Sequence, residues 1–361
     1  MAEEKQRVSQ PAPTGLHDSA RQPPSASSVE RPALGPSQHA RRPGDFFSRD
    51  EVRALTRRSN LMGAWSILST WAVIALAFAA IAWGWSLPLG LAVPVVLLAL
   101  AVLAGRQVAL AILTHEATHK TLFDSRWAND VLTDWLCGRP VGLDLHKYRA
   151  HHFIHHSKTG TDEDTDISLI EGLPTTPASM RRKILRDLSG ITGLKFLLGR
   201  VLMDAEQMKW TVATNVEWLP KRGWRYHLAA LARNSFPSLL TNLILFALLY
   251  ASGYPWLYLA WVIAYLIPYP LFIRLRALAE HAGTERSSDM FRNTRTTRAG
   301  LIASTFIAPF RVNYHLEHHV MASVPWFRLK KMHQILRERG VVADPPGYGD
   351  VMRIVVSRSD V

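Results

Sequence analysis

The sequence contains a single cysteine, Cys137, among 361 residues. One thiol excludes a disulfide within the chain, and it also excludes an iron–sulfur cluster, which needs several cysteine ligands. The chain has no G-x-G-x-x-G segment after a strand pattern and no His-Pro-Gly-Gly segment of the kind found in cytochrome b5-like domains. The sequence therefore offers no recognisable nicotinamide site and no built-in electron carrier.

Large apolar side chains are scarce in residues 1–45, where seven prolines and many serines occur. Such a segment cannot bury enough surface to offset its ordering entropy, so we predict a disordered Pro/Ser-rich N-terminal tail. It lacks the apolar h-region of a secretory signal peptide.

Charged side chains are almost absent from four apolar stretches, which we predict as membrane spans at about 61–85, 89–112, 235–252 and 255–273. About 20 apolar residues in a helix cross a hydrocarbon core of roughly 30 Å. The turns at 86–88 and 252–255 are very short, which predicts two helical hairpins. Two buried hairpins of a soluble protein are the alternative, and four such runs joined in pairs argue against it.

The formal net charge is +13, with 42 Lys and Arg against 29 Asp and Glu. A basic balance can indicate nucleic acid binding, but here cations such as Arg57, Arg58 and Arg222 flank the apolar runs. Neither turn between paired spans carries a cation. The positive-inside rule therefore places both termini and the 106–234 loop in the cytoplasm. We predict an integral protein of a bacterial inner membrane, without a nucleic acid partner, in which residues 341–361 form a C-terminal cytoplasmic tail.

Between the predicted hairpins, residues 180–209 alternate apolar and basic side chains at helical spacing. This pattern predicts one or two amphipathic helices that lie against anionic headgroups. A surface helix of the cytosolic part is the alternative.

Nine of the fifteen histidines gather in short segments with spacings H-x-x-x-H, H-x-x-H-H and H-x-x-H-H plus one singleton. They are His115 and His119; His152, His155 and His156; His281; and His315, His318 and His319. Residues four apart share a helix face, while adjacent residues can reach different partners. Nine imidazoles exceed the needs of one four-coordinate ion, and they suffice for two ions with water completing the shells. The sequence therefore predicts a dinuclear metal centre at a membrane surface.

Two alternatives remain open at this point. His115-Glu116-x-x-His119 is also the zinc metalloprotease signature, in which Glu116 would be the general base. In the second cluster, His151 could replace His152 as a ligand. Carboxylates near the clusters are candidates to accept the outer ring N–H of a ligand histidine; they are Glu116, Asp164, Asp166 and Glu317. His17, His39, His227 and His333 are interpreted as solvated or hydrogen-bonded side chains.

Three segments together resemble the membrane fatty acid desaturase family: Tyr148-Arg149-x-x-His-x-x-His-His, Glu280-His281, and residues 313–319 with Ser323-Val324-Pro325 beyond. The resemblance covers roughly residues 50–340, with a desaturase domain at 46–340. It implies an all-α integral membrane protein with four transmembrane helices in two hairpins and a cytoplasmic helical cap that carries the histidine boxes. It also implies that the nine clustered histidines are iron ligands, His281 being the family's extra one. Met321-Ala322 and Ala277 depart from residues frequent in relatives.

The resemblance further implies two non-haem irons that use O₂ to remove hydrogen from a fatty acyl chain or other lipid. Zinc has no redox chemistry and cannot supply this reaction. A hydroxylase, ketolase or other oxygenase of the same superfamily is the main alternative, and a polar small molecule is an alternative substrate. A metal transporter is a more remote hypothesis, because residues 62–84 and 236–252 contain no His, Asp or Glu.

Each O₂ cycle of such a centre needs two electrons from outside the substrate, so a ferredoxin or cytochrome b5-like carrier with its reductase is the expected partner. Ferredoxins tend to be acidic, and cations flank the last histidine cluster. We predict that the carrier docks on them; they are Arg292, Arg295, Arg298, Arg328, Lys330 and Lys331.

Overall fold

The computed structural model describes residues 42–357, so most of the predicted N-terminal tail lies outside the described residues. Within this range the chain is helical, with two isolated β-bridges and no strand. The α-helices are α1 (Arg49–Leu55), α2 (Asn60–Gly84), α3 (Leu89–Thr118), α4 (Leu145–Lys158), α5 (Pro177–Leu188), α6 (Ile191–Asp204), α7 (Trp224–Ala251), α8 (Leu257–Leu266), α9 (Pro268–His281), α10 (Met290–Asn293), α11 (Leu301–Phe306), α12 (His315–Val320), α13 (Trp326–Glu338) and α14 (Tyr348–Val355). The prediction of an all-α protein is confirmed for the described part.

Four helical stretches of the described chain are long and apolar enough to cross a membrane, as predicted. They are Arg49–Gly84, Leu89–Thr118, Trp224–Ala251 and Leu257–His281. Leucines on the outer faces of α2 and α7, such as Leu68 and Leu243, are exposed. Apolar surface of this extent is typical of a protein that contacts lipid. The molecule is therefore an integral membrane protein.

The fourth stretch is two helices rather than one continuous span. Helix α8 ends at Leu266, and α9 begins at Pro268 after the single residue Ile267. Pro268 and Pro270 have no backbone N–H to continue the ladder of α8, which explains the break. Helix α9 then extends beyond the predicted boundary at residue 273 and carries His281 at its last position.

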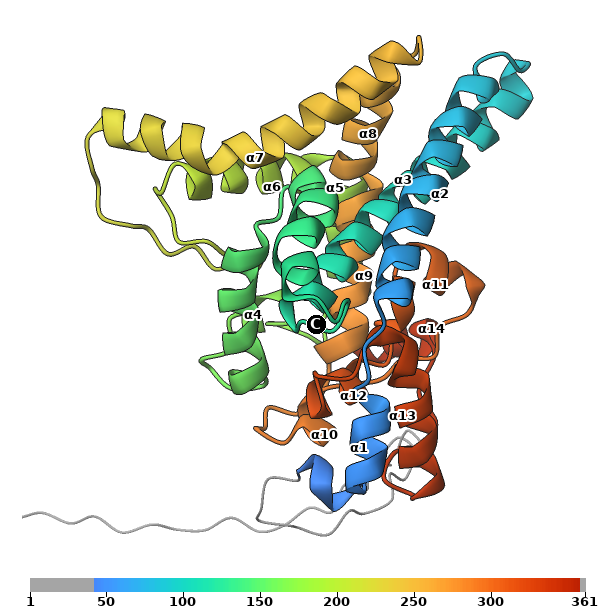
Figure 1. The fold of residues 1–361 in the computed structure, drawn as a ribbon, viewed down its shortest axis with the longest axis vertical. Coiled ribbons are helices and arrows are strands. Elements are labelled where there is room, and N and C mark those ends of the chain that lie inside the picture. The colour runs from blue at the N-terminus through green and yellow to red at the C-terminus, as the bar shows by residue number, and fades with distance from the viewer. Residues whose placement is uncertain (1–41, 358–361) are drawn as a thin grey trace, which may run out of the picture. The chain divides into compact units, whose positions relative to one another are not determined.

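Helix α3 is the central element and packs against α2, α4, α8, α9 and α11. From the middle of α3 toward its C-terminal end, the side chains of Leu103, Leu110 and Ile112 are fully buried. At Gly105 a Cβ atom would lie 2.8 Å from the carbonyl oxygen of Thr305, so only glycine lets α11 approach this closely. In Figure 1 the α2–α3 and α7–α8 turns lie on the same side, opposite α1, α12 and α13.

The region predicted as amphipathic, residues 180–209, contains α5 and α6. Both expose apolar residues, including Leu185, Leu194 and Leu198. Near the C-terminus, α14 packs on α9, with Val351 and Val355 buried against Leu278 and Ala282. The segment expected as a C-terminal tail therefore contains a packed helix.

Candidate metal centre

The four histidine clusters lie at or near the ends of helices. His115 belongs to the last turn of α3, and His119 is the residue that caps it. Helix α4 carries His152, His155 and His156, α9 ends at His281, and the short helix α12 carries the last three. Because α3 packs on both α4 and α9, segments far apart in the sequence meet at one place.

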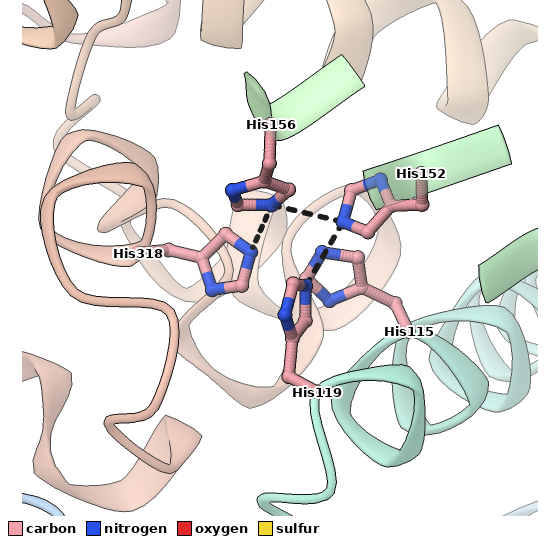
Figure 2. Close-up of side chains that lie close together, drawn as sticks. All are labelled: His115, His119, His152, His156 and His318. Carbon is pink, nitrogen blue, oxygen red and sulfur yellow. Dashed lines mark hydrogen bonds between the residues drawn. The ribbon is translucent and has the colours of Figure 1, made fainter. Parts of the chain in front are cut away.

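The structure brings these histidines together in two groups. The first group contains His115, His119, His152, His156 and His318 (Figure 2). The second group contains His155, His281, His315 and His319. Within each group one ring nitrogen from every residue lies within 4.8 Å of those of all the others. The two groups together contain all nine clustered histidines.

Helix periodicity explains how the boxes divide between the groups. On α4, His152 and His156 are four apart and reach the first group, while His155 faces the second. On α12, His315 and His319 reach the second group, and His318 faces the first. An H-x-x-H-H spacing on a helix therefore serves two neighbouring positions, as the sequence predicts.

The spacing of the ring nitrogens tests whether a metal ion fits. In the first group, the Nε2 atom of His152 lies 3.0 Å from those of His119 and His156, and the latter lies 3.1 Å from that of His318. In the second group, Nε2 of His315 lies 2.9 Å from that of His281 and 3.1 Å from that of His319. Two nitrogens bound at right angles to one ion at about 2.1 Å would lie about 3.0 Å apart. The donors therefore fit a metal ion in each group.

Both ring nitrogens of His115 are buried and have no hydrogen-bond partner within residues 42–357. A buried nitrogen without a partner lowers the stability of the fold unless a bound group, such as a metal ion or a water molecule, satisfies it. Burial also lowers the pKa of His119 to about 3 and holds the pKa values of His152 and His318 well below the ordinary value. Their imidazoles are neutral at neutral pH, which is the form that binds metal.

Outer hydrogen bonds fix the orientation of several rings. The Nδ1–H of His155 donates to Asp164 at 2.7 Å, and that of His281 donates to the carbonyl oxygen of Asn293 at 3.2 Å. A proton on Nδ1 leaves the Nε2 lone pair facing the group. His319 Nδ1 lies 3.4 Å from the hydroxyl of Thr159, and His315 Nδ1 lies 3.6 Å from Glu280.

The four carboxylates named from the sequence have different surroundings. Asp164 contacts His155, as described. Asp166 lies 2.8 Å from Nε2 of His151 and 3.9 Å from Nδ1 of His155. Although burial alone would lower the pKa of His155, these two aspartates outweigh it and the pKa is raised. His151, the alternative ligand, belongs to neither group.

Glu116 and Glu317 hold neighbouring elements. Glu116 accepts hydrogen bonds from the hydroxyl of Thr121 and the backbone N–H of Trp326, both at 3.0 Å. Its other oxygen lies 3.8 Å from Nδ1 of His115. Glu317 accepts from Thr296 and from Nδ1–H of His333, the latter at 2.7 Å.

Sequence reasoning missed three contributors. Glu280 was named as part of a motif but not as a neighbour of His315, and His333 was given no role beside the boxes. Arg149 donates to the carbonyl oxygens of Ala117 and Thr118, each at 3.0 Å, and so caps the helix that carries the first box. The Tyr148-Arg149 pair preceding the second cluster was the available signal for this last contact.

Of the six predicted docking cations, three contact other residues of the protein and three are exposed without an ion pair in the described part of the chain. Arg292 pairs with Glu285, Arg295 donates to the carbonyl oxygen of Ala282 at 2.8 Å, and Arg328 donates to that of Arg57 at 3.1 Å. The side chains of Arg298, Lys330 and Lys331 are exposed and form no ion pair with another described residue.

Comparison with known proteins agrees with this geometry. A family model described as "Fatty acid desaturase" matches residues 91–350. Dihydrorhizobitoxine desaturase of Bradyrhizobium elkanii is 26% identical over 334 residues, which cover 84% of this chain and 82% of that protein. The matched range contains all four histidine clusters and both groups that they form. This chain belongs to the fatty acid desaturase family.

Proposed function

We propose that the chain is an O₂-dependent desaturase in which the nine clustered histidines bind two non-haem iron ions. His115, His119, His152, His156 and His318 would hold one iron, and His155, His281, His315 and His319 the other. The observation that carries this proposal is the division of the histidines into two groups whose Nε2 atoms are spaced as metal ligands are. When bound, the irons supply the redox chemistry that activates O₂.

The proposed reaction converts a –CH₂–CH₂– unit into –CH=CH–. Two hydrogens leave the substrate, two electrons come from an external carrier and two protons come from solvent, and one O₂ becomes two waters. The protein's part is to bring the imidazoles together and to hold their rings in place. Asp164 and the Asn293 carbonyl do so by fixing the protons on Nδ1 of His155 and His281.

The proposed substrate is an acyl chain of a membrane lipid, or an acyl chain on a soluble carrier. The family description and the membrane-length helices support this choice. The relative from Bradyrhizobium elkanii is named for dihydrorhizobitoxine, so a substrate other than a fatty acid is a second candidate.

We further propose that the four spans form two hairpins in a bacterial inner membrane, with both termini and the histidine-bearing helices in the cytoplasm. The cation-free turns at 86–88 and 252–255 support this topology. Reporter fusions at residue 45, after Gly160 and at the C-terminus test it. All three should report the cytoplasmic side, and an external signal at Gly160 would contradict the topology.

The alternatives from the sequence receive less support. In a zinc protease Glu116 would face a metal-bound water, but it accepts hydrogen bonds from Thr121 and Trp326 instead. His115 and His119 also share their group with three other histidines. A transport path would place ionisable groups inside the spans, and residues 62–84 have none.

Mass spectrometry of lipids and small metabolites from a heterologous host tests the reaction. Expression of the intact gene should yield products that are two hydrogens lighter, and the His155→Ala variant should yield none. Products heavier by one oxygen would instead indicate a hydroxylase of the same superfamily. Elemental analysis showing zinc and no iron in purified protein would contradict the proposal.

A further inference from the structure

Helix α13 contacts two of the histidine clusters, once through a backbone N–H and once through a buried side chain. At its first residue, the backbone N–H of Trp326 donates to Glu116 in the first box. Two turns later, the buried His333 donates to Glu317, which lies between the candidate ligands His315 and His318. One short helix is therefore connected to both boxes on its inner side.

The outer side of α13 borders a groove of about 510 Å³. Its lining includes Arg298, Lys330 and Arg337, and deeper residues Tyr314 and His333. Tyr314 directly precedes His315 of the second group, and His333 reaches Glu317. The groove thus leads from the surface to residues that are bonded to the metal-binding segment.

The groove and its rim carry more positive than negative charge. Arg298, Lys330 and the neighbouring Lys331 are exposed. Arg337 pairs with Asp344 at 2.7 Å, and Glu338 is the other acidic residue of the lining. Four cations therefore face two carboxylates, which favours an anionic partner.

The position of α13 distinguishes a protein from lipid headgroups as that partner. Arg328 contacts Arg57, next to the start of α2, whereas Arg339 contacts Glu51 on α1 (Figure 1). From Lys330 to Glu338 the helix advances roughly 12 Å. A headgroup layer is only about 5–7 Å thick on each side. With the four spans placed across a bilayer, the groove would therefore extend past the headgroups into the aqueous phase.

We propose that this groove docks a small acidic protein that carries single electrons, an inference that rests on the proposed function. Two reduced carriers dock in turn, and each is oxidised by one electron, so that the pair supplies the two electrons of one O₂ cycle. Docking here brings the carrier's redox group against Tyr314 and His333, which adjoin the last histidine cluster, His315, His318 and His319.

The test measures oxidation of a reduced plant-type [2Fe–2S] ferredoxin by the iron-loaded enzyme in lipid nanodiscs. The double variant Arg298→Glu with Lys330→Glu should lower the second-order rate roughly tenfold at low ionic strength and weaken its dependence on salt. The matched control is Arg181→Glu with Arg182→Glu, an exposed pair on α5 with the same change in net charge. It should stay within about twofold of the unaltered enzyme.

Three outcomes would overturn the docking proposal. They are an unchanged rate in the groove variant, equal slowing in the control, and a difference that disappears when phosphatidylglycerol in the nanodiscs is replaced by phosphatidylcholine. Turnover driven by dithionite needs no docking, so it should be equal in all variants. Its absence from the unaltered enzyme would contradict the proposed function instead.

Discussion

The two histidine groups differ in how their rings are held. In the second group every histidine is buried, and Nδ1 of His155, His281 and His319 lies within 3.4 Å of an oxygen. Nδ1 of His315 lies 3.6 Å from Glu280 and has no hydrogen-bond partner in the described chain. In the first group His119 and His156 are partly exposed, and the Nδ1 atoms of the buried His115 and His152 have no hydrogen-bond partner in the described chain.

For the proposed irons, this difference predicts two ways of building a metal site. The second group has four histidines, and neighbouring oxygens orient most of their rings. The first group has five histidines, so it offers one more candidate ligand and fewer orienting contacts. A four-ligand site should be sensitive to the loss of one ligand or of its orienting oxygen. A five-ligand site should keep its ion after losing one histidine.

The largest expected effect comes from removing one ligand from each group. His281→Ala should leave about one iron per chain, and His119→Ala should retain close to two. Both should lower turnover roughly a thousandfold, because a metal-activated reaction loses several kcal/mol of stabilisation. Iron analysis and product formation measure these outcomes, with His227→Ala as a control that changes neither. Equal iron loss in both variants would remove the distinction between the groups.

A smaller effect is expected from the outer carboxylates. Asp164→Asn should weaken iron binding at the second group by about 10- to 100-fold, because His155 loses a charged acceptor. Glu116→Gln should change iron binding less than about threefold, because the amide oxygen can still accept from the Trp326 N–H. Competition with a chelator measures both, and thermal unfolding controls for damage to the fold. A greater loss of iron in Glu116→Gln would reverse the comparison.

The smallest effect is expected at Thr159, whose hydroxyl lies 3.4 Å from Nδ1 of His319 and donates to the carbonyl oxygen of His155. Thr159→Val keeps the shape and removes both contacts. Chelator competition should show a change of about twofold, since so long a hydrogen bond is weak. A tenfold change would show that this hydroxyl fixes the ring of His319 as firmly as Asp164 fixes that of His155.

Local patterns predicted much of this molecule. Apolar runs located the spans, and helical spacing explains why His155 and His156 face different groups. The break at Ile267 was missed, because a run of apolar residues suggests a continuous span even where Pro268 and Pro270 interrupt the backbone ladder.

Contacts between segments far apart in the sequence were harder to predict from the sequence. His333 reaches Glu317 only because α13 folds back along α12, and nothing in the spacing of the histidines indicates this return. The same holds for the carbonyl oxygen of Asn293, since every residue has one and no side-chain pattern marks it.

Helix α3 runs without interruption from Leu89 to Thr118, which is about 45 Å of helix. A hydrocarbon core of about 30 Å accounts for only two thirds of that length. With α3 placed across a bilayer, His115 and His119 would therefore lie up to roughly 15 Å outside the core. If the proposed substrate is an acyl chain, it would have to leave the hydrocarbon core to react, at about 0.8 kcal/mol for each methylene exposed to water. The position of a new double bond would then depend on how many methylenes the protein can bury between the hydrocarbon core and the histidine groups.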